Sequence, residues 1–429
     1  MDSTLGVGLL GAGTVGGTLI RRLVDDRGAI EAKTGLALDV KRVAVRDLGK
    51  KRSFSLSDGV LTDDPAQVVA DPEVQLVVEL MGGRHPAGDL VLAALNAGKP
   101  VVTANKELIA ARGPELIMAA ERHGVPLLFE AAVGGAIPII RPLSESLAGE
   151  SIARVLGIVN GTTNFILTQM DEHGSSYDDA LAEAQRLGYA EADPAADVSG
   201  ADAAAKTAIL ASLAFGTWIG IDDVYFEGIE DLEPVDLGFA ADLGYVIKLL
   251  AVAEMTGAGA TARVHPAMVP AGHPLAPISG SMNAVFIEGP SVDRLLFAGP
   301  GAGGEPTATA VLGDLIDAAR ELMAGAQVAQ RIRFAPGAII PFDNVPTAWY
   351  LRLEVDDRPG VLARIAGAFG QAEVGIRSVR QEGRGGGATL IIVTHEALES
   401  SQRAALAAIR DLDAVRSVGA ILRVQGGDE

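Results

Sequence analysis

The chain has 429 residues, enough for two to four domains, and a hydrophobic content of 48% that supplies a sizeable core. Its 55 acidic and 35 basic residues give a net charge of −20, which argues against nucleic acid or an anionic membrane as a partner. There is no cysteine, so disulfides, thiolate metal sites and cysteine nucleophiles are excluded. The N-terminus lacks the basic region of a signal peptide, and the longest uncharged apolar stretch, 207–221, is shorter than the ~18 residues of a membrane span. We therefore expect a cytoplasmic protein.

The first part of the chain alternates short apolar segments with amphipathic ones. Segments typical of buried strands lie at 5–11, 36–45, 76–80, 101–105 and 125–133, and segments with helical spacing lie at 15–25, 89–98 and 113–124. Strand and helix in alternation predict an α/β fold with a Rossmann-type, doubly wound parallel sheet that has helices on both faces. We expect this domain to span residues 1–135 and to bind NAD(P).

The middle of the chain, residues 136–320, predicts a different kind of domain. Helices are expected at 201–215 and 309–323, and further strands near Ala262, Val285 and Leu295, which together indicate an α+β domain with a mixed sheet. Residues 321–345 include a segment with two prolines and are expected to return to the nucleotide domain or to act as a linker.

The last segment, 349–429, reads as strand, helix, strand, strand, helix, strand. This βαββαβ order is the ferredoxin-like pattern.

A glycine-rich loop follows the first predicted strand and opens the first helix. Its GxGxxG pattern permits a tight turn and lets the backbone approach a pyrophosphate at the helix N-terminus. The residues predicted to bind a dinucleotide here are Gly11, Ala12, Gly13, Thr14, Val15 and Gly16.

The end of the second strand bears on the choice between the two nicotinamide cofactors. Arg46, followed by Lys50, Lys51 and Arg52, favours binding of the NADP phosphate. Asp47 could instead hold the ribose 2′-hydroxyl of NAD, so both cofactors remain open. A solvated basic turn without a ligand is the alternative.

A lysine inside an apolar helix is the first candidate for proton transfer. Lys206 lies four residues after Asp202, on the same face of the predicted helix 201–215. A desolvated lysine can exchange a proton, which arginine cannot. Spacing alone leaves a second interpretation open, because a carboxylate four residues before a lysine is a common surface pair, and Ser199 with Asp202 matches a capping box.

Two other places carry charged residues suited to a ligand. Glu191, Asp193 and Asp197 crowd one turn and could bind a substrate ammonium group or a cation, or could be solvated. Lys106 follows the strand that ends near Thr103, at the edge of an open α/β sheet where ligands sit, although a lysine at a helix start is equally common.

Several segments of the chain resemble homoserine dehydrogenases, in the form that carries a C-terminal ACT domain. They are GLLGAGTVGG, VVTANKELIA, FEAAVGGAIPII, GIVNGTTNFIL, RLGYAEADPAADVSGADAAAKTAIL, AGPGAGGEPTATAVLGDL, DRPGVLARIAGAFG and GIRSVRQEG. The resemblance implies reversible reduction of L-aspartate 4-semialdehyde to L-homoserine with NADPH or NADH, in threonine, methionine and isoleucine biosynthesis. It also implies catalytic and dimerisation roles for 136–320, a homodimer or homotetramer, and an ACT regulatory domain at 349–429.

The resemblance implies roles for individual residues. Lys206, Asp202 and Lys106 match catalytic positions, and Glu191, Asp197, Gly161, Thr162 and again Lys206 match substrate-binding positions. Thr103, Lys106, Gly303 and Glu305 join the loop residues, Arg46, Lys51 and Arg52 as cofactor-binding positions. Glu130, Val133, Gly135 and Ile137 match a site for a monovalent cation such as sodium, and Gly360 and Ile376 lie where a threonine effector would dock.

Two other functions compete with this interpretation. A hydroxyacid dehydrogenase of serine synthesis also joins a dinucleotide fold to an ACT domain, but its loop lies in the middle of the sequence and its site uses His, Glu and Arg. A non-catalytic amino-acid sensor with a nucleotide fold is the other, and it predicts no turnover. An ACT domain that only supports oligomerisation is the alternative to threonine feedback.

Overall fold

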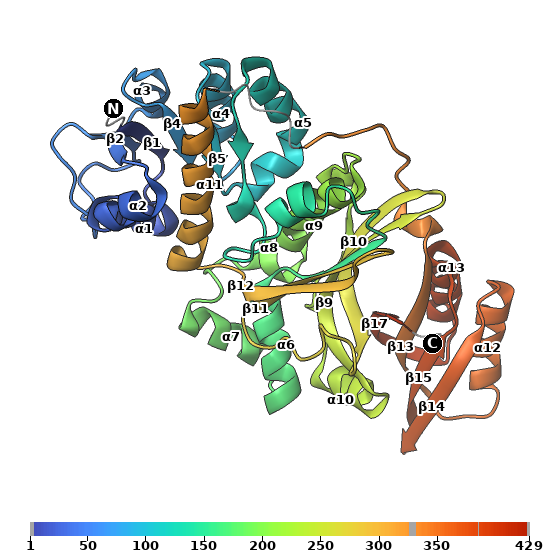
Figure 1. The fold of residues 1–429 in the computed structure, drawn as a ribbon. Coiled ribbons are helices and arrows are strands. Elements are labelled where there is room, and N and C mark those ends of the chain that lie inside the picture. The colour runs from blue at the N-terminus through green and yellow to red at the C-terminus, as the bar shows by residue number, and fades with distance from the viewer. Residues whose placement is uncertain (1–3, 326–331, 385, 427–429) are drawn as a thin grey trace. The chain divides into compact units, whose positions relative to one another are not determined.

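The computed structural model describes residues 4–325, 332–384 and 386–426, and these form two compact units. The first unit is drawn from the described residues of 1–151, 208–221 and 297–336, and the second from those of 152–207, 222–296 and 337–429. The chain therefore passes between the units several times. Figure 1 labels the helices and strands of both units.

The first unit is built on a six-stranded sheet in the order β3-β2-β1-β4-β5-β6, and the neighbouring strands pair in parallel. This confirms the predicted doubly wound sheet, in which the order of the strands reverses between β1 and β4, where such folds bind ligands. The strands are β1 (Leu5–Leu10), β2 (Leu38–Ala44), β3 (Leu61–Thr62), β4 (Leu76–Glu79), β5 (Val101–Thr103) and β6 (Leu127–Leu128). The helices are α1 (Thr14–Asp25), α2 (Arg27–Thr34), α3 (Pro65–Ala70), α4 (Ala87–Asn96) and α5 (Lys106–His123).

A late segment of the chain completes this unit. Helix α11 (Gly304–Ala324) is longer than the predicted 309–323, and it packs on α1 and the first sheet. Its Ala308, Val311, Leu312 and Leu315 follow helical spacing, so they form one apolar stripe in the same core as Leu19 of α1. Residues 304–320 of this helix, expected in the middle domain, belong to the first compact unit.

The predicted strand at 125–133 is much shorter in the structure. Only β6 is extended, and the chain then forms a 3₁₀ turn at Glu130–Ala132. Gly134 and Gly135 follow with φ of +73° and +58°, which ends any strand at this point. A π-helical turn spans Pro142–Ser146.

The second unit contains a larger mixed sheet in the order β12-β11-β7-β9-β10-β17-β13-β15-β14, with β8 on β10 and β16 on β13. The strands are β7 (Arg154–Ile158), β8 (Tyr225–Phe226), β9 (Tyr245–Thr256), β10 (Gly259–Pro270), β11 (Met282–Gly289), β12 (Asp293–Pro300), β13 (Pro346–Asp356), β14 (Ile376–Arg384), β15 (Gly387–Thr394), β16 (Ala397–Leu398) and β17 (Val415–Val424). Its helices are α6 (Gly161–His173), α7 (Tyr177–Leu187), α8 (Ala195–Val198), α10 (Pro234–Asp242), α12 (Val361–Gln371) and α13 (Glu399–Arg410). Helix α9 (Ala201–Phe215) belongs to both units, because its residues 201–207 are part of the second and 208–215 are part of the first. The predicted mixed sheet is confirmed, and α9 begins and ends where predicted.

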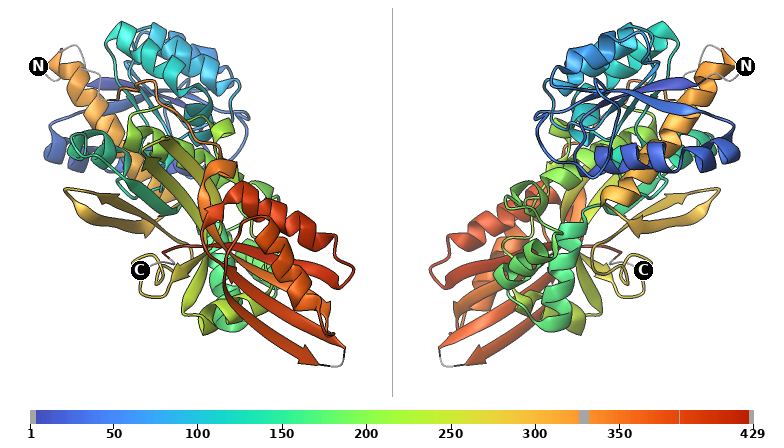
Figure 2. Two further views of the ribbon diagram at one scale, coloured as in Figure 1. Left: turned by 90° about the vertical axis from the view of Figure 1, so that its right-hand side faces the viewer. Right: turned by 90° about the vertical axis from the view of Figure 1, so that its left-hand side faces the viewer.

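The C-terminal part of this unit has the predicted βαββαβ order, β13-α12-β14-β15-α13-β17. Figure 2 shows α12 and α13 side by side against the strands, and they share a core with Trp349, Leu351 and Ile392. The order alone could not reveal that β17 also pairs in parallel with β10, through Ala267 with Arg423. The C-terminal strands therefore continue the sheet of the middle part of the chain.

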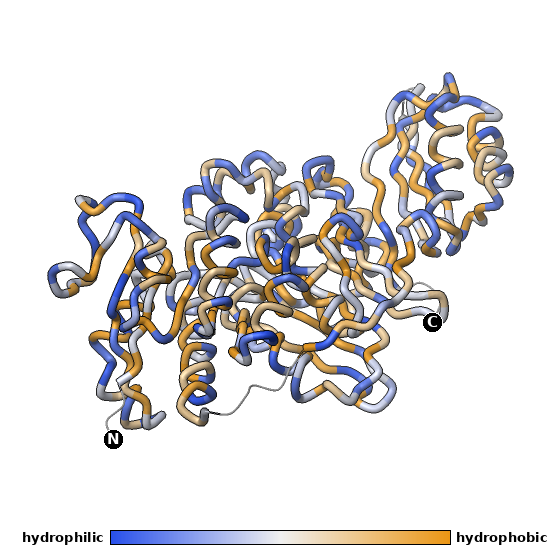
Figure 3. Tube along the Cα trace, turned by 90° about the horizontal axis from the view of Figure 1, so that it is seen from above, coloured by the Kyte–Doolittle hydropathy of each residue, from blue (hydrophilic) through white to orange (hydrophobic). Residues whose placement is uncertain are grey.

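Figure 3 shows the hydropathy of the chain, in which hydrophobic and hydrophilic residues alternate along most segments. Among the helices of the described residues, none combines the length and the apolarity that crossing a membrane requires.

Candidate active site

The glycine-rich loop joins β1 to α1 in the first unit. Gly11 has a φ of +105°, and a Cβ there would lie 2.7 Å from the carbonyl oxygen of Leu80. A Cβ on Gly16 would overlap the carbonyl oxygen of Gly11. Gly13 differs, since a Cβ there would meet nothing within 4 Å, and it caps α1 without a side-chain hydrogen bond. The loop therefore leaves the first amides of α1 open to a bound anion, which fits the pyrophosphate of a dinucleotide.

The N-terminus of α11 lies against the first turn of α1. A Cβ on Gly304 would come within 3.1 Å of the Thr14 methyl group, and Gly303 has a φ of +123° that favours glycine. Glu305 is held by Arg21, with 3.2 Å between the carboxylate and the guanidinium. Gly303 and Glu305, predicted cofactor positions, thus lie beside the glycine-rich loop in the same unit.

The basic segment after β2 forms an exposed loop. Arg46 and Lys51 are exposed. Arg52 turns back, because its guanidinium donates to the carbonyl oxygen of Lys50 at 2.8 Å and to that of Asp47. The Asp47 carboxylate accepts the amide N–H of Gly49 at 2.8 Å. Asp47, the residue that could hold the NAD ribose, therefore makes a hydrogen bond within its own loop.

The ends of β4 and β5 carry a buried polar cluster that the sequence analysis did not single out. Glu79 is fully buried, and its carboxylate accepts the Thr103 hydroxyl at 2.6 Å and the amides of Met81 and Gly82 at 2.7 and 3.1 Å. The Thr103 hydroxyl accepts in turn the amide of Asn105, the N-cap residue of α5. The first residue of that helix is Lys106, a predicted catalytic and cofactor position. Glu79 thus fixes the ends of two strands at the ligand-binding edge of the sheet.

The second candidate centre lies in the second unit, where α9 meets the end of β7. The Lys206 ammonium donates to the Asp202 carboxylate at 2.6 Å and to the carbonyl oxygen of Val159 at 2.8 Å. The side chains of Lys206 and Asp202 are only 12% and 9% exposed. A solvated surface pair, one of the two interpretations of this spacing, is therefore not what the structure contains.

Asn160 links this pair to a second carboxylate. Its amide donates to Asp202 at 2.9 Å and to Asp197 at 2.7 Å, while its side-chain oxygen accepts the Thr163 amide as the N-cap of α6. Burial raises the pKa of Asp197, and the Asn160 amide acts against that rise. Asn160 was missed as a site residue, although an asparagine between a strand and a helix is a recognisable N-cap signal.

The remaining predicted substrate residues surround Asp197 to different degrees. The Thr162 hydroxyl donates to the Tyr189 carbonyl oxygen at 2.7 Å and lies 3.3 Å from Asp197. Gly161 begins α6, and a Cβ there would lie 2.6 Å from the carbonyl oxygen of Ser281. Glu191 is exposed in the loop before α8. The structure therefore brings Lys206, Asp202, Asp197 and Thr162 into one hydrogen-bonded cluster and leaves the Glu191 side chain outside it.

The predicted cation segment follows β6 in the first unit. The Glu130 carboxylate accepts the amides of Ile139, Ile140 and Arg141 at 2.6, 2.8 and 2.9 Å, so its side-chain oxygens are already used. Val133, Gly135 and Ile137 offer only main-chain oxygens. In the described ranges, no group of three or more His, Asp or Glu side chains is arranged to hold a metal ion.

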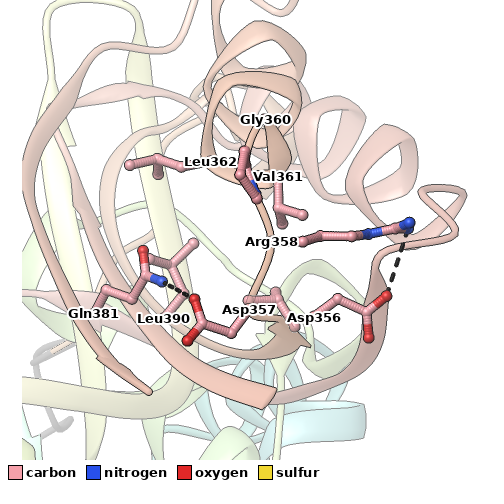
Figure 4. A pocket seen from close by; sticks show the side chains of 10 residues that line it. Asp356, Asp357, Arg358, Gly360, Val361, Leu362, Gln381 and Leu390 are labelled. Atoms are coloured by element: carbon pink, nitrogen blue, oxygen red, sulfur yellow. Dashed lines mark hydrogen bonds and ion pairs between the residues drawn. The ribbon is translucent and has the colours of Figure 1, made fainter. Parts of the chain in front are cut away.

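A pocket of about 350 Å³ opens in the C-terminal part of the second unit. Figure 4 shows Asp356, Asp357 and Arg358 beside Gly360, which caps α12 with a φ of +92°. Gly360 was a predicted effector position and lines the pocket, whereas Ile376 is not among its lining residues. The residue of β14 that lines it is Gln381, whose amide lies 3.3 Å from Asp357.

Known proteins resemble this chain in both sequence and fold. Three family models match: "Homoserine dehydrogenase, NAD binding domain" at residues 11–130, "Homoserine dehydrogenase" at 138–316 and "ACT domain" at 349–414. A homoserine dehydrogenase of Mycobacterium tuberculosis is 46% identical over 99% of this chain and 98% of its own.

Solved structures of homoserine dehydrogenases also resemble this chain. The homoserine dehydrogenase of Thiobacillus denitrificans superposes with a TM-score of 0.92 at 43% identity, over 99% of this chain and 98% of that one. A hyperthermophilic archaeal homoserine dehydrogenase in complex with NADPH gives 0.61 at 28% identity, over 76% of this chain and 100% of that one. The chain belongs to the homoserine dehydrogenase family, NAD(P)-dependent oxidoreductases that here carry a C-terminal ACT domain.

Proposed function

We propose that the chain interconverts L-aspartate 4-semialdehyde and L-homoserine at the cluster formed by Lys206, Asp202, Asn160 and Asp197. The observation that carries the proposal is the buried ammonium of Lys206, held by one carboxylate and one carbonyl oxygen. These two hydrogen bonds use two of the three N–H donors of an ammonium group, and the third suits a substrate oxygen.

The cofactor is proposed to be NADP(H), with NAD(H) as the second choice. The open amides at the start of α1 suit a pyrophosphate, and the exposed Arg46 and Lys51 suit a ribose phosphate. The Asp47 carboxylate, which would favour NAD, accepts the Gly49 amide through one of its two oxygens, so NAD(H) stays the second choice. Thr103 and Lys106 would lie on the nicotinamide side of this site, at the strand edge that Glu79 fixes.

The nicotinamide, when bound, supplies a hydride to the aldehyde carbon of the substrate or accepts one from the alcohol carbon. In the reductive direction negative charge grows on the aldehyde oxygen, and the Lys206 ammonium donates a hydrogen bond and then its proton to that oxygen. In the oxidative direction the Lys206 amine accepts the hydroxyl proton. Asp202 keeps the lysine oriented and balances its charge. Lys106 is proposed as a second positive charge for the reaction.

Substrate binding is assigned to the carboxylates near the same cluster. Asp197, with Thr162 and Gly161 at the start of α6, would bind the amino-acid part of the substrate, and Glu191 would take its ammonium group. Burial raises the pKa of Asp197. Because the protonated carboxyl loses its negative charge, we expect homoserine binding to weaken as the pH falls through the pKa of Asp197.

Each domain of the chain is proposed to have its own role. Residues 1–135 would bind the cofactor, 136–320 would supply catalysis and dimerisation with 321–345 returning to the nucleotide domain or linking, and 349–429 would regulate. The pocket at Gly360 would take threonine as a feedback effector, and main-chain oxygens of Glu130, Val133, Gly135 and Ile137 would bind a monovalent cation. A cytoplasmic homodimer or homotetramer is the expected form.

Two substitutions of one residue test the role of Lys206. Lys206→Ala removes the charge and the proton donor, whereas Lys206→Arg keeps the charge but cannot exchange a proton near neutral pH. We expect kcat for homoserine oxidation to fall at least 100-fold in both variants, roughly what loss of general acid–base catalysis costs. The exposed Lys33→Ala is the control and should match the wild type. Wild-type kcat in Lys206→Arg would mean that Lys206 moves no proton.

A further inference from the structure

An ion-pair cluster around the buried Arg423 joins the C-terminal domain to the middle of the second unit. The Arg423 side chain, on β17, is 3% exposed, and both of its terminal nitrogens donate to the Glu227 carboxylate, one of them at 2.8 Å. The same guanidinium donates to Glu399 of α13 at 2.6 Å and lies 5.0 Å from the Trp349 ring. Although burial acts to raise it, the pKa of Glu399 stays below its ordinary value because of Arg423. The cluster is therefore charged.

Glu227 follows β8 and lies outside the C-terminal domain. Its amide donates to the Val264 carbonyl oxygen of β10 at 2.8 Å, and the Tyr225 hydroxyl donates to its carboxylate. Glu227 is thus the residue through which Arg423 reaches the segment 225–229.

That segment packs directly on the turn that carries the candidate active-site carboxylates. The Ile229 amide donates to the Val198 carbonyl oxygen at 3.0 Å. A Cβ on Gly228 would overlap that same oxygen and lie 2.7 Å from the Ser199 Cα. A Cβ on Gly200 would lie 2.8 Å from the Glu227 carbonyl oxygen. The two backbones touch without room for a side chain between them, so a shift of one moves the other.

The turn in question, 198–200, connects two functional positions. Asp197 lies in α8 just before it, and Asp202 is the second residue of α9 just after it. Movement of this turn would therefore change the distance of both carboxylates from Asn160, which lies outside α8 and α9.

We propose that Glu227 is a positioning residue, and that its ion pair with Arg423 couples the C-terminal domain to the turn between Asp197 and Asp202. The state of the C-terminal domain then sets the affinity for homoserine. The inference rests on the proposed roles of Asp197 in substrate binding and of Asp202 in orienting Lys206. It concerns residues that do not touch substrate themselves.

Steady-state kinetics of the full-length chain test the coupling. Glu227→Gln keeps the shape of the side chain but removes its charge. We expect KM for homoserine to rise about 10-fold while KM for NADP stays within 2-fold, because the glycine-rich loop belongs to the other unit. A merely structural loss would lower the amount of active enzyme and leave both KM values unchanged.

The matched control is Glu254→Gln. Glu254 pairs with a similarly buried arginine, Arg263, at 2.8 Å, with 24% of its side chain exposed against 32% for Glu227. It lies on β9, and we expect its variant to keep the wild-type KM for homoserine. An equal rise in Glu254→Gln, an equal rise in KM for NADP, or no rise in Glu227→Gln would overturn the proposal.

Two further variants keep the test decisive. If Glu227→Gln does not fold, Glu227→Asp retains the charge with a shorter side chain, and we expect KM for homoserine to rise about 3-fold; an unchanged KM would overturn the coupling. Asp197→Asn tests the substrate role of Asp197 independently of the coupling through Glu227. A wild-type KM for homoserine in Asp197→Asn would refute the substrate role of that carboxylate, whatever the Glu227 variants show.

Discussion

Alanine at two glycines of the same loop should have opposite consequences for stability and for cofactor binding. Gly13→Ala introduces a Cβ that meets no protein atom within 4 Å, at a residue with φ of −75°. We expect the free energy of unfolding to stay within about 0.5 kcal/mol of the wild type, since alanine is a slightly poorer N-cap but restricts the unfolded chain. The new methyl group would instead occupy the space through which a pyrophosphate approaches the backbone.

The affinity that Gly13→Ala loses for NADPH depends on how many amides at the start of α1 can still reach the pyrophosphate. If two hydrogen bonds from amides to the pyrophosphate are lost at about 1.5 kcal/mol each, the loss is about 3 kcal/mol, or roughly 100-fold in Kd for NADPH. Gly16→Ala acts differently, because its Cβ would overlap the Gly11 carbonyl oxygen and lie 3.1 Å from the Gly11 carbonyl carbon. Overpacking of this buried position should lower the free energy of unfolding by about 1–3 kcal/mol.

Two assays separate these effects. Fluorescence titration with NADPH gives Kd, and urea denaturation gives the free energy of unfolding for the wild type and both variants. Wild-type affinity in Gly13→Ala would refute the assignment of the loop to the pyrophosphate. Wild-type stability in Gly16→Ala would refute the claim that close packing of the loop requires glycine there.

Three more substitutions test other parts of the account. Asn160→Ala removes the amide that holds the pKa of Asp197 down, so the acid limb of kcat/KM for homoserine should move to higher pH; an unmoved limb in a pH–rate profile would contradict this. Burial lowers the pKa of Lys248 from 10.5 to about 8, so the unfolded state binds more protons between these values and wild-type stability should rise over that range by about 3 kcal/mol. Urea denaturation from pH 8 to 10.5 should show this slope in the wild type and not in Lys248→Met. Glu79→Gln leaves either Thr103 or the loop amides facing an amide donor, which should cost about 2 kcal/mol of stability and weaken NADPH binding; an unchanged Kd would show that Glu79 does not shape the site.

Much of the fold could be predicted because its signals are local. The GxGxxG loop, the helix at 201–215 and the βαββαβ order are all patterns of neighbouring residues, and the structure contains each of them. Lys206 and Asp202 were paired from their spacing, but only the fold shows that the pair is buried.

The remaining features depend on residues that are far apart in the sequence. Asn160 bridges two carboxylates 37 and 42 residues away, and Arg423 pairs with Glu227 across 196 residues. The pairing of β17 with β10 is of the same kind, because the sequence of a strand does not specify which distant strand it will pair with. Glu79 reads as an ordinary strand-end residue until the fold shows that its carboxylate is buried.

We propose that the chain oxidises L-homoserine through Lys206. The most direct measurement is the rate of NADP reduction, and separately of NAD reduction, with L-homoserine and the full-length chain, in the wild type and in Lys206→Ala. We expect the wild type to turn over homoserine faster with NADP than with NAD, and Lys206→Ala to lose this turnover while it still binds NADPH. A folded wild-type chain that binds NADPH but oxidises no homoserine with either cofactor would contradict the account and favour an amino-acid sensor.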